Sequence, residues 1–400
     1  MLESEAMALL VSAVYQYARR EAALRAAGSA LGLIADPFAF ARELGEGGAA
    51  AVKRSVMEKD ALFEKLELSG VRLLARGEAG YSTLLAQTAL PPHLLFVRGE
   101  TNLGDELPIA VVGTRKANEY GLRHSRKIAR ELAGAGACIV SGLATGVDAQ
   151  AHEGALDAGA RTIAVLGGAH DRFFPAENRA LAEEIVAAGG SIVTEYPMGM
   201  PPTRYSFLHR NRIIAGLSLG VLATQGAYRS GAHRTVSDAA DEGREVFALP
   251  GSVDDTRSQL PHKLIGEGAH LATCAADILR VLAPQREALL LKRGKMAVRD
   301  TAAVEKVPAS AEGRSRAKSM ASTQRPKKAP AKKAFAMPEG IDDAHRVVLE
   351  ALMQGEQEFD ALCEMTGLAG DEMGALLMEL EIDGIVDSLP GLRYALSGEV

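Results

Sequence analysis

The chain has 400 residues, 47% of them apolar, which is enough for ordinary buried cores in two or three domains. The three cysteines, Cys138, Cys274 and Cys363, lie far apart without a CxxC pair, which argues against a disulfide framework and a thiolate zinc site. The acidic start, LESEAMALL, is unlike a signal peptide, and no uncharged stretch reaches the roughly 18 to 20 residues of a membrane span. These features predict a cytoplasmic protein without membrane contact.

Residues 1–75 are rich in Ala, Leu and Glu, and their apolar residues recur at helical spacing in MALLVSAVYQYARREAALRAA and AAVKRSVMEKDALFEKLELSG. The spacing predicts a small helical domain. A connector, YSTLLAQTALPPHLLFVRGE, is expected to end in a short strand.

Residues 80–290 alternate short apolar runs with helical stretches, which is typical of a doubly wound α/β domain with a mainly parallel sheet. The predicted strands are IAVVG (109–113), CIVSG (138–142), TIAVLGG (162–168), SIVTE (191–195), GVLAT (220–224) and EVFALPG (245–251).

Ligands of such domains bind beyond the carboxyl ends of the strands, so the residues after each strand are the first candidates. These residues are small or basic: Gly113, Thr114, Arg115, Ser141, Gly142, Ser230 and Gly231. Glycines admit a ligand close to the backbone, and N–H groups at a helix start bind anions. Each glycine taken alone could merely close a turn, but their coincidence with several arginines favours a phosphate site.

The stretch FLHRNRIIAGLS sets Phe207, Arg210, Asn211 and Arg212 ahead of an apolar run. A guanidinium offers two parallel donors to a phosphate. Phe207 is either a core residue or a platform on which bases stack. Arg210 is expected to contact phosphate, whereas Arg212, nearer the apolar run, is the better candidate for an internal partner of a carboxylate such as Glu195.

Other chemistries have little support in the sequence. GTRKANEYG lacks the GxGxxG fingerprint and GxxxxGK[ST] is absent, so we expect neither NAD nor ATP, and no cofactor. Asp148 and His152, four residues apart, could form an acid/base pair or half a metal site; a local capping and packing role is favoured. No catalytic residue and no metal are predicted.

The motifs VVGTRKANEYG, IVSGLATGVDAQAHEGAL, TIAVLGGAHDRFFPAENRALAEEI, TEYPMGMPP, FLHRNRIIAGLS and RSGAHRTVSDAADEGREVFALPGS resemble, in order and spacing, the DNA-processing protein A family (DprA, also called Smf). The resemblance implies an extended Rossmann-like domain that binds single-stranded DNA, dimerises and helps to load the recombinase RecA during natural transformation. It also implies a SAM-like fold for the helical domain. By this resemblance the residues after the strands and the Phe207 to Arg212 segment are the DNA contacts.

The sequence departs from the family pattern at Thr145, Leu208, Gln225, His233, Arg234, Leu260 and His262. Arg234 could restore the positive charge that Thr145 lacks. An alternative function is a nucleotide-processing hydrolase of the LOG type, but QGAYRSGAHRT offers no acid where those enzymes have their glutamate. A binding protein that is not an enzyme is therefore favoured.

Residues 291–338 form a basic tract without hydrophobic periodicity and are predicted to be a disordered linker, either a tether or an auxiliary polyanion-binding segment. From Lys292 to Phe335 it has thirteen Lys or Arg against three acids, an excess of +10. Residues 339–400 have three helical periods and two strand-like runs about a Pro-Gly turn, the outline of a winged helix. Because GDEMGALLMELEIDG is acidic, we expect protein interaction or autoregulation rather than groove binding.

Overall fold

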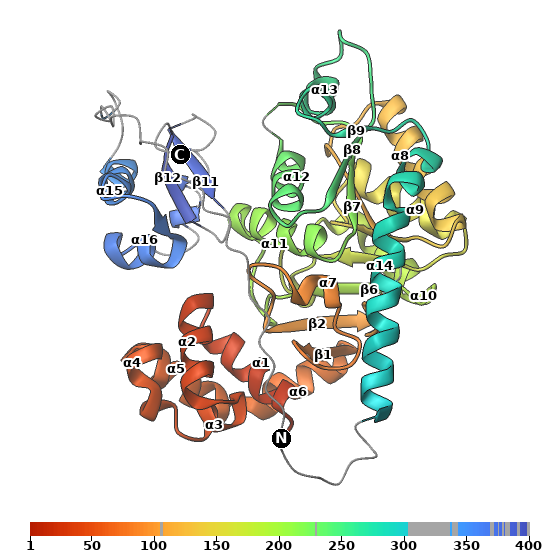
Figure 1. Ribbon diagram of the computed structural model, residues 1–400. Helices are drawn as coiled ribbons and strands as arrows, with labels where there is room; N and C mark the ends of the chain where they lie inside the picture. Colours follow the sequence, from red (N-terminus) through yellow and green to blue (C-terminus); the bar gives the residue numbers. More distant parts are fainter. Residues whose placement is uncertain are drawn as a thin grey trace, which may run out of the picture.

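The computed structural model describes residues 1–104, 107–228, 230–302, 337, 343–368, 372–374, 376–377, 380, 385–389 and 393–397, with the backbone alone for residues 292–302. It comprises a helical domain, a central α/β domain and a C-terminal winged-helix domain (Figure 1). Most of the basic tract lies outside the described residues.

The helical domain consists of α1 (Glu3–Ala13), α2 (Tyr17–Ala27), α3 (Ala30–Ala35), η1 (Pro37–Phe40), α4 (Ala41–Leu44), α5 (Glu46–Met57) and α6 (Lys59–Leu68). Its core includes Leu9, Leu10 and Leu33, and it continues onto Leu94 and Phe96 of the sheet. The helical prediction is therefore confirmed for these elements. The expected boundary at residue 75 is too late, because residues 71–75 already form a strand of the central sheet.

The central sheet has nine strands in the order β1-β2-β6-β5-β4-β3-β7-β8-β9. Its strands are β1 (Val71–Ala75), β2 (Leu94–Gly99), β3 (Pro108–Val112), β4 (Cys138–Ser141), β5 (Thr162–Val165), β6 (Ser191–Thr194), β7 (Gly220–Ala223), β8 (Glu245–Ala248) and β9 (His270–Leu271). All six predicted strands are present, and the connector ends in β2 as expected. The β1–β2 and β2–β6 pairs are antiparallel. All further neighbours along the sheet, from β6 through β5, β4, β3, β7 and β8 to β9, pair in parallel.

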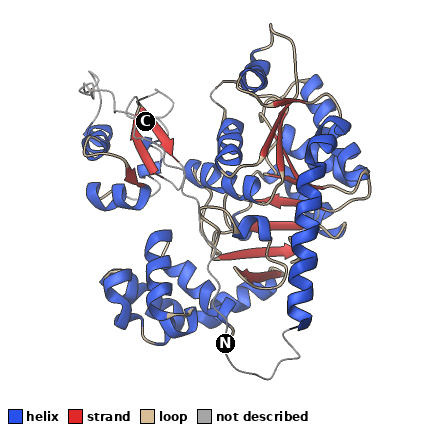
Figure 2. Cartoon of the chain, viewed as in Figure 1, coloured by secondary structure: helices blue, strands red, loops and turns tan. Residues whose placement is uncertain are grey.

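Helices cover both faces of the sheet, as Figure 2 shows. Alternate strand residues belong to different cores because successive side chains point to opposite faces. The helices of this domain are α7 (Thr83–Ala86), α8 (Glu119–Gly134), α9 (Val147–Asp157), η2 (His170–Arg172), η3 (Ala176–Asn178), α10 (Arg179–Ala187), α11 (Arg204–Gly216), α12 (Gly231–Asp241), η4 (Thr256–Ser258), α13 (Gln259–Gly266) and α14 (Ala275–Ala302). Ile109 and Val111 pack with α8, α9 and α14, whereas Ala110 and Val112 pack with α11, α12 and α13.

Helix α14 changes one predicted boundary. The linker was expected to begin at residue 291, but the helix continues to Ala302. Beyond it, the winged-helix domain contains α15 (Asp343–Leu352), β10 (Gln357–Glu358), α16 (Phe359–Thr366), β11 (Val386–Leu389) and β12 (Arg393–Leu396). The antiparallel β11–β12 pair confirms the two predicted strand-like runs.

Candidate nucleic-acid interface

The candidate site lies at the carboxyl edge of the parallel strands. Strand order reverses at β3, which has β4 on one side and β7 on the other. Such a reversal opens a crevice for ligands. The loops after these strands lead into α8, α9 and α12. The free N–H groups and the dipole of a helix start favour an anion, so the topology suits a phosphate-containing ligand.

The first turn, after β3, is tied to the loop after β7. The Thr114 N–H donates to the Gln225 carbonyl at 2.7 Å. Gln225 is buried, and its side-chain amide donates to Asn118 Oδ1 at 2.9 Å and accepts from the Asn118 N–H at 3.2 Å. Asn118 also caps α8 through the Gly121 N–H. These bonds hold the turn in place and leave Arg115 exposed beside it.

The second turn, after β4, is internal. Ser141 Oγ donates to the Val111 carbonyl at 2.6 Å and is buried, so its hydroxyl is used within the sheet. A Cβ on Gly142 would lie 2.6 Å from Arg210 Nη2 and 2.7 Å from Asp148 Oδ2. A side chain at position 142 would therefore displace both charged groups.

Arg210 differs from the expectation that it faces a phosphate, because only 4% of it is exposed. Its Nη1 donates to the Gly142 carbonyl at 2.9 Å and also to the Val165 carbonyl. Burial lowers the pKa of Arg210 to about 10, although the nearby Asp148 carboxylate opposes the shift, so the guanidinium stays charged at neutral pH. The Arg210 side chain is thus buried beneath the ends of β4 and β5 and links them by hydrogen bonds. The expected phosphate contact of Arg210 stays a prediction, which the salt dependence of DNA binding by an Arg210→Ala variant can test.

Asp148 and His152 have the local roles that were favoured. Burial raises the pKa of Asp148, against the lowering effect of Arg210, and Asp148 Oδ2 accepts from the Ala144 N–H at 3.4 Å. His152 is fully buried, and its Nδ1 lies 2.8 Å from Thr162 Oγ1. Among the described residues, no group of three or more His, Cys, Asp or Glu is placed to hold a metal ion.

Arg212 pairs with Glu195, the carboxylate suggested by the sequence. Arg212 also donates to the Leu90 carbonyl at 2.7 Å, and His209 Nδ1 lies 3.0 Å from Glu195 Oε1. Burial alone would raise the pKa of Glu195, but Arg212 and His209 outweigh it and lower the value to about 2. Arg212, Glu195 and His209 therefore form an internal ion-pair cluster that links α11 to the end of β6.

Phe207 is half-buried at the carboxyl edge and is surrounded on several sides. A Cβ on Gly167 would lie 2.5 Å from the Phe207 Cδ1, so the ring packs closely on that backbone. The Arg115 guanidinium carbon lies 5.1 Å from the ring centroid, within cation–π range. Phe174, which is 48% exposed, tilts against Phe207 at 5.6 Å between centroids. Phe174 was not among the residues predicted from the sequence. Its only local signal there is the FFP triplet after the third predicted strand.

The last turn follows β7 and leads into α12, and α11 is hydrogen-bonded to the start of that helix. Asn211 Nδ2 donates to the carbonyl of Gly231, the first residue of α12, at 3.2 Å. Ser230 precedes this helix, and its buried Oγ has no hydrogen-bond partner in the described part of the chain. The structure thus assembles the predicted residues at one edge, but Arg115, Phe207 and Gly231 are accessible there, whereas Ser141, Gly142, Arg210 and Asn211 lie mainly beneath it.

Several of the residues that depart from the family pattern have structural partners. Arg234 pairs with Asp238 one turn along α12, so its charge is engaged there rather than supplied at Thr145. His262 Nε2 lies 3.1 Å from the Gly251 carbonyl, and His233 Nε2 lies 3.2 Å from Lys263 Nζ. Leu260 is fully buried in the core beneath α13.

Comparisons with known proteins agree with this arrangement. A family model described as DNA recombination-mediator protein A matches residues 72–283, and one described as DprA winged helix domain matches residues 325–391. Protein Smf of Synechocystis sp. is 33% identical over 343 residues, which are 83% of this chain and 82% of that protein. Protein Smf of Escherichia coli is 42% identical over 217 residues, 54% of this chain and 58% of that protein. The X-ray structure of DNA processing protein A from Streptococcus pneumoniae matches with a TM-score of 0.60 at 32% identity, covering 70% of this chain and 98% of that one.

No helix within the described ranges is both long and apolar enough to cross a bilayer.

Proposed function

Since the chain belongs to the DNA recombination-mediator protein A family, we propose that it binds single-stranded DNA at the carboxyl edge of its parallel sheet and mediates recombination. In this role it protects incoming or processed single strands and helps to load the RecA recombinase, as in natural transformation. It works as a homodimer in the cytoplasm and carries out no catalytic step on the strand.

The observation that supports the proposal most directly is the Phe207 ring, which we call the platform because bases can stack on it. The ring is held from behind by the Gly167 backbone and lies beside Phe174 and Arg115. An aromatic ring accepts any base, and stacking contributes about 1 to 3 kcal/mol per base. Stacking requires an unpaired base, so this chemistry favours single strands over duplex DNA.

The surroundings support a binding role for the same edge. Arg115 is exposed, so its guanidinium can leave the ring and meet a phosphate when a base takes its place. The carboxylates Asp148 and Glu195 are each faced by a buried arginine, Arg210 and Arg212. Carboxylates held in this way are poor candidates for moving a proton or attacking a substrate.

The test is a titration of labelled single-stranded and blunt duplex DNA of equal length across a range of salt. We expect the single strand to bind more tightly at every salt concentration, and equal affinities would contradict the proposal. Phe207→Leu should reduce the difference, because it keeps the apolar contact with Gly167 but removes the stacking face. Phe38→Leu, at an exposed phenylalanine of the helical domain, is the matched control and should leave the preference intact. RecA loading is tested separately by the rate of RecA assembly on single strands with and without this protein.

A further inference from the structure

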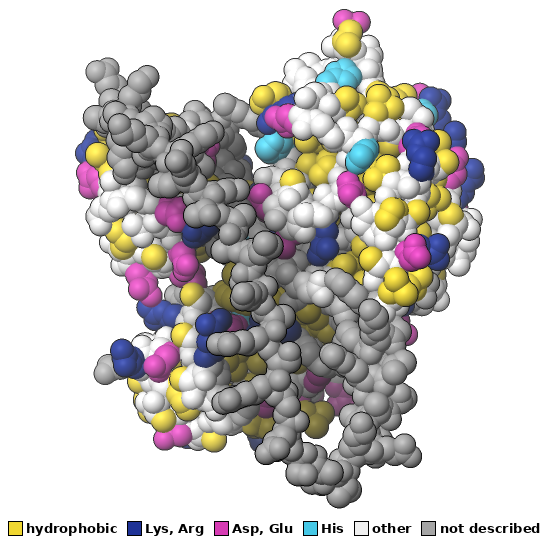
Figure 3. All heavy atoms as spheres, viewed as in Figure 1, with side chains coloured by type: hydrophobic (Ala, Val, Ile, Leu, Met, Phe, Trp, Pro, Cys, Tyr) yellow, Lys and Arg dark blue, Asp and Glu magenta, His cyan; other side chains and the backbone are white. Residues whose placement is uncertain are grey.

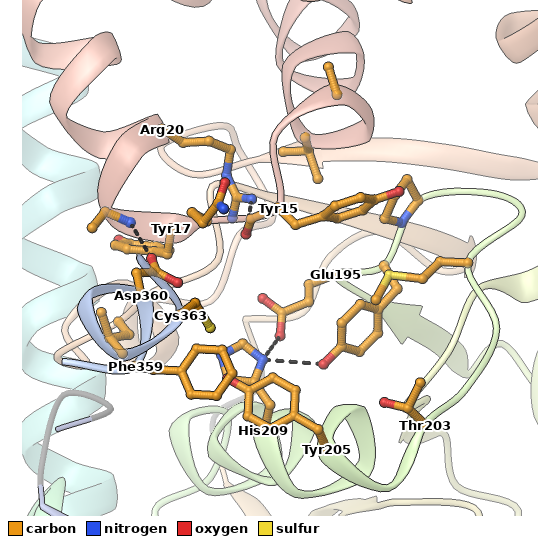
Figure 4. Close-up of a pocket in the computed structure, with 18 of the residues that line it drawn as sticks. Tyr15, Tyr17, Arg20, Glu195, Thr203, Tyr205, His209, Phe359, Asp360 and Cys363 are labelled. Carbon is orange, nitrogen blue, oxygen red and sulfur yellow. Dashed lines mark hydrogen bonds and ion pairs between the residues drawn. The ribbon is translucent and has the colours of Figure 1, made fainter. Parts of the chain in front are cut away.

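The winged-helix domain is seated on α11 through an aromatic contact. Phe359, the first residue of α16, stacks on Tyr205 of α11 with 4.5 Å between centroids and 11° between planes. Tyr205 in turn stacks on His209 at 5.5 Å. Figure 4 shows the three rings side by side, with His209 directed toward Glu195. The ring of the winged-helix domain therefore extends an aromatic column that begins on α11.

A second contact joins the winged-helix domain to the helical domain. Arg19 Nε donates to Glu364 Oε1 at 3.0 Å, and the Ala18 N–H donates to Asp360 Oδ2 at 3.4 Å. Figure 3 shows Asp and Glu side chains of the winged-helix domain opposite Lys and Arg side chains of the helical domain. The Arg19–Glu364 pair is partly exposed, so it can be changed without opening a core.

The C-terminal domain has a high net negative charge for its size. Residues 339–400 contain fifteen Asp or Glu against two Arg, Arg346 and Arg393, a formal charge of −13. With the excess of +10 between residues 292 and 335, the rest of the chain sums to only −3. The winged-helix domain is thus as strongly anionic as a short stretch of nucleic acid.

This anionic domain lies close to the candidate DNA segment. Its carboxylates Glu358, Asp360 and Glu364 line a cavity of about 690 Å³ together with Thr203 and Tyr205 at the start of α11. Phe207 is two residues beyond Tyr205, or about 3 Å along the helix axis. Because residues two apart point to different sides of a helix about 10 to 12 Å across, the charge of the domain reaches a strand stacked on Phe207 mainly at low salt, where the screening length is about 30 Å at 0.01 M.

We propose that the docked winged-helix domain is an internal acidic competitor of the DNA strand, which lowers the affinity of the platform until the domain is released. The inference rests on the proposed single-strand binding. Phe207 packs on Gly167, whereas Tyr205 faces α16, so the domain acts on the strand through charge repulsion rather than by covering the ring. By reciprocity, bound single strands favour the released state.

The charge reversal Arg19→Glu distinguishes this proposal from simple electrostatics. It removes positive charge from the body, which by itself would weaken DNA binding. It also replaces the ion pair by a repulsion, which releases the winged-helix domain. We expect the affinity for single-stranded DNA to rise about two- to fivefold at low salt, the range that an exposed ion pair can contribute to the docking equilibrium. The gain should shrink as salt screens the repulsion.

Two further variants of the full chain complete the test. Arg19→Glu combined with Glu364→Arg has the wild-type net charge and restores the pair, so its affinity should return to that of wild type. Lys53→Glu, an equal charge change at an exposed site on α5, should weaken binding slightly. Small-angle scattering should show a larger radius of gyration for Arg19→Glu alone.

The outcomes separate the two proposals. If Arg19→Glu binds no more tightly than Lys53→Glu, or if its gain persists in the double variant, the competitor role is overturned. If neither the wild type nor any variant prefers single strands, the proposed function itself fails.

Discussion

The Arg212 guanidinium is paired with the Glu195 carboxylate, and both side chains are mostly buried between α11 and the loop after β6. Breaking a buried pair leaves an uncompensated charge, which costs about 3 to 5 kcal/mol of stability. We therefore expect Arg212→Ala to lower the free energy of unfolding by about that amount, as measured by urea unfolding followed by circular dichroism. Combining Arg212→Met with Glu195→Gln should recover much of the loss. A stable single variant would show that His209 alone suffices to hold Glu195.

Arg210→Ala is expected to behave as a structural variant. Its removal leaves the Gly142 and Val165 carbonyls without their donor and Asp148 without its facing charge. Buried charge partners are costly to remove, so the melting temperature should fall markedly. The slope of log K against log salt should stay at the wild-type value. A well-folded variant with a reduced salt slope would instead place Arg210 on a phosphate.

Arg115→Ala is the counterpart on the accessible side of the same edge. Arg115 is exposed and its guanidinium lies over the Phe207 ring, so stability should change little. A phosphate contact on a single strand contributes about 0.7 to the salt slope, and the slope should decrease by that amount. Arg115→Lys should keep the slope, since charge is retained, while weakening binding through loss of the planar fork. If the salt slope is unchanged in Arg115→Ala, Arg115 covers the Phe207 ring but does not contact a phosphate.

His152 should make the protein less stable in mild acid. Burial lowers its pKa to about 3 in the folded protein, against an ordinary value of 6.5. Between these values the unfolded chain binds a proton that the folded chain does not, so the free energy of unfolding falls by up to about 1.4 kcal/mol for each unit of decreasing pH. His93 and His170, with pKa values lowered to about 4 by burial, contribute in the same direction. His152→Gln should therefore reduce this pH slope by about one proton without abolishing it. Urea unfolding between pH 7 and pH 5 provides the measurement, and an unchanged slope would contradict the assignment.

The positions of the parallel strands along the chain followed from the sequence because each strand is a short apolar run between glycine-containing turns. IAVVG and CIVSG are buried on both faces, so their composition alone distinguishes them from the amphipathic stretches between them. The family resemblance was equally local, since it depended on motifs of contiguous residues. The small and basic residues after the strands gather at one edge, because the carboxyl ends of parallel strands meet there.

The tertiary structure alone decided which of these residues face outward. Arg210 and Arg212 are two positions apart on α11, so they point in different directions, and each meets a different buried acceptor from another loop. The spacing of the two arginines was visible in the sequence, but the Gly142 and Val165 carbonyls that receive Arg210 come from distant strands. Phe174 and Phe359 were likewise unremarkable in the sequence, since the rings that they contact, Phe207 and Tyr205, reach them only when three separate segments fold together. Local periodicity determines where helices and strands form. Whether a side chain such as Arg210 is buried or accessible to a ligand depends on packing between segments that are far apart in the sequence.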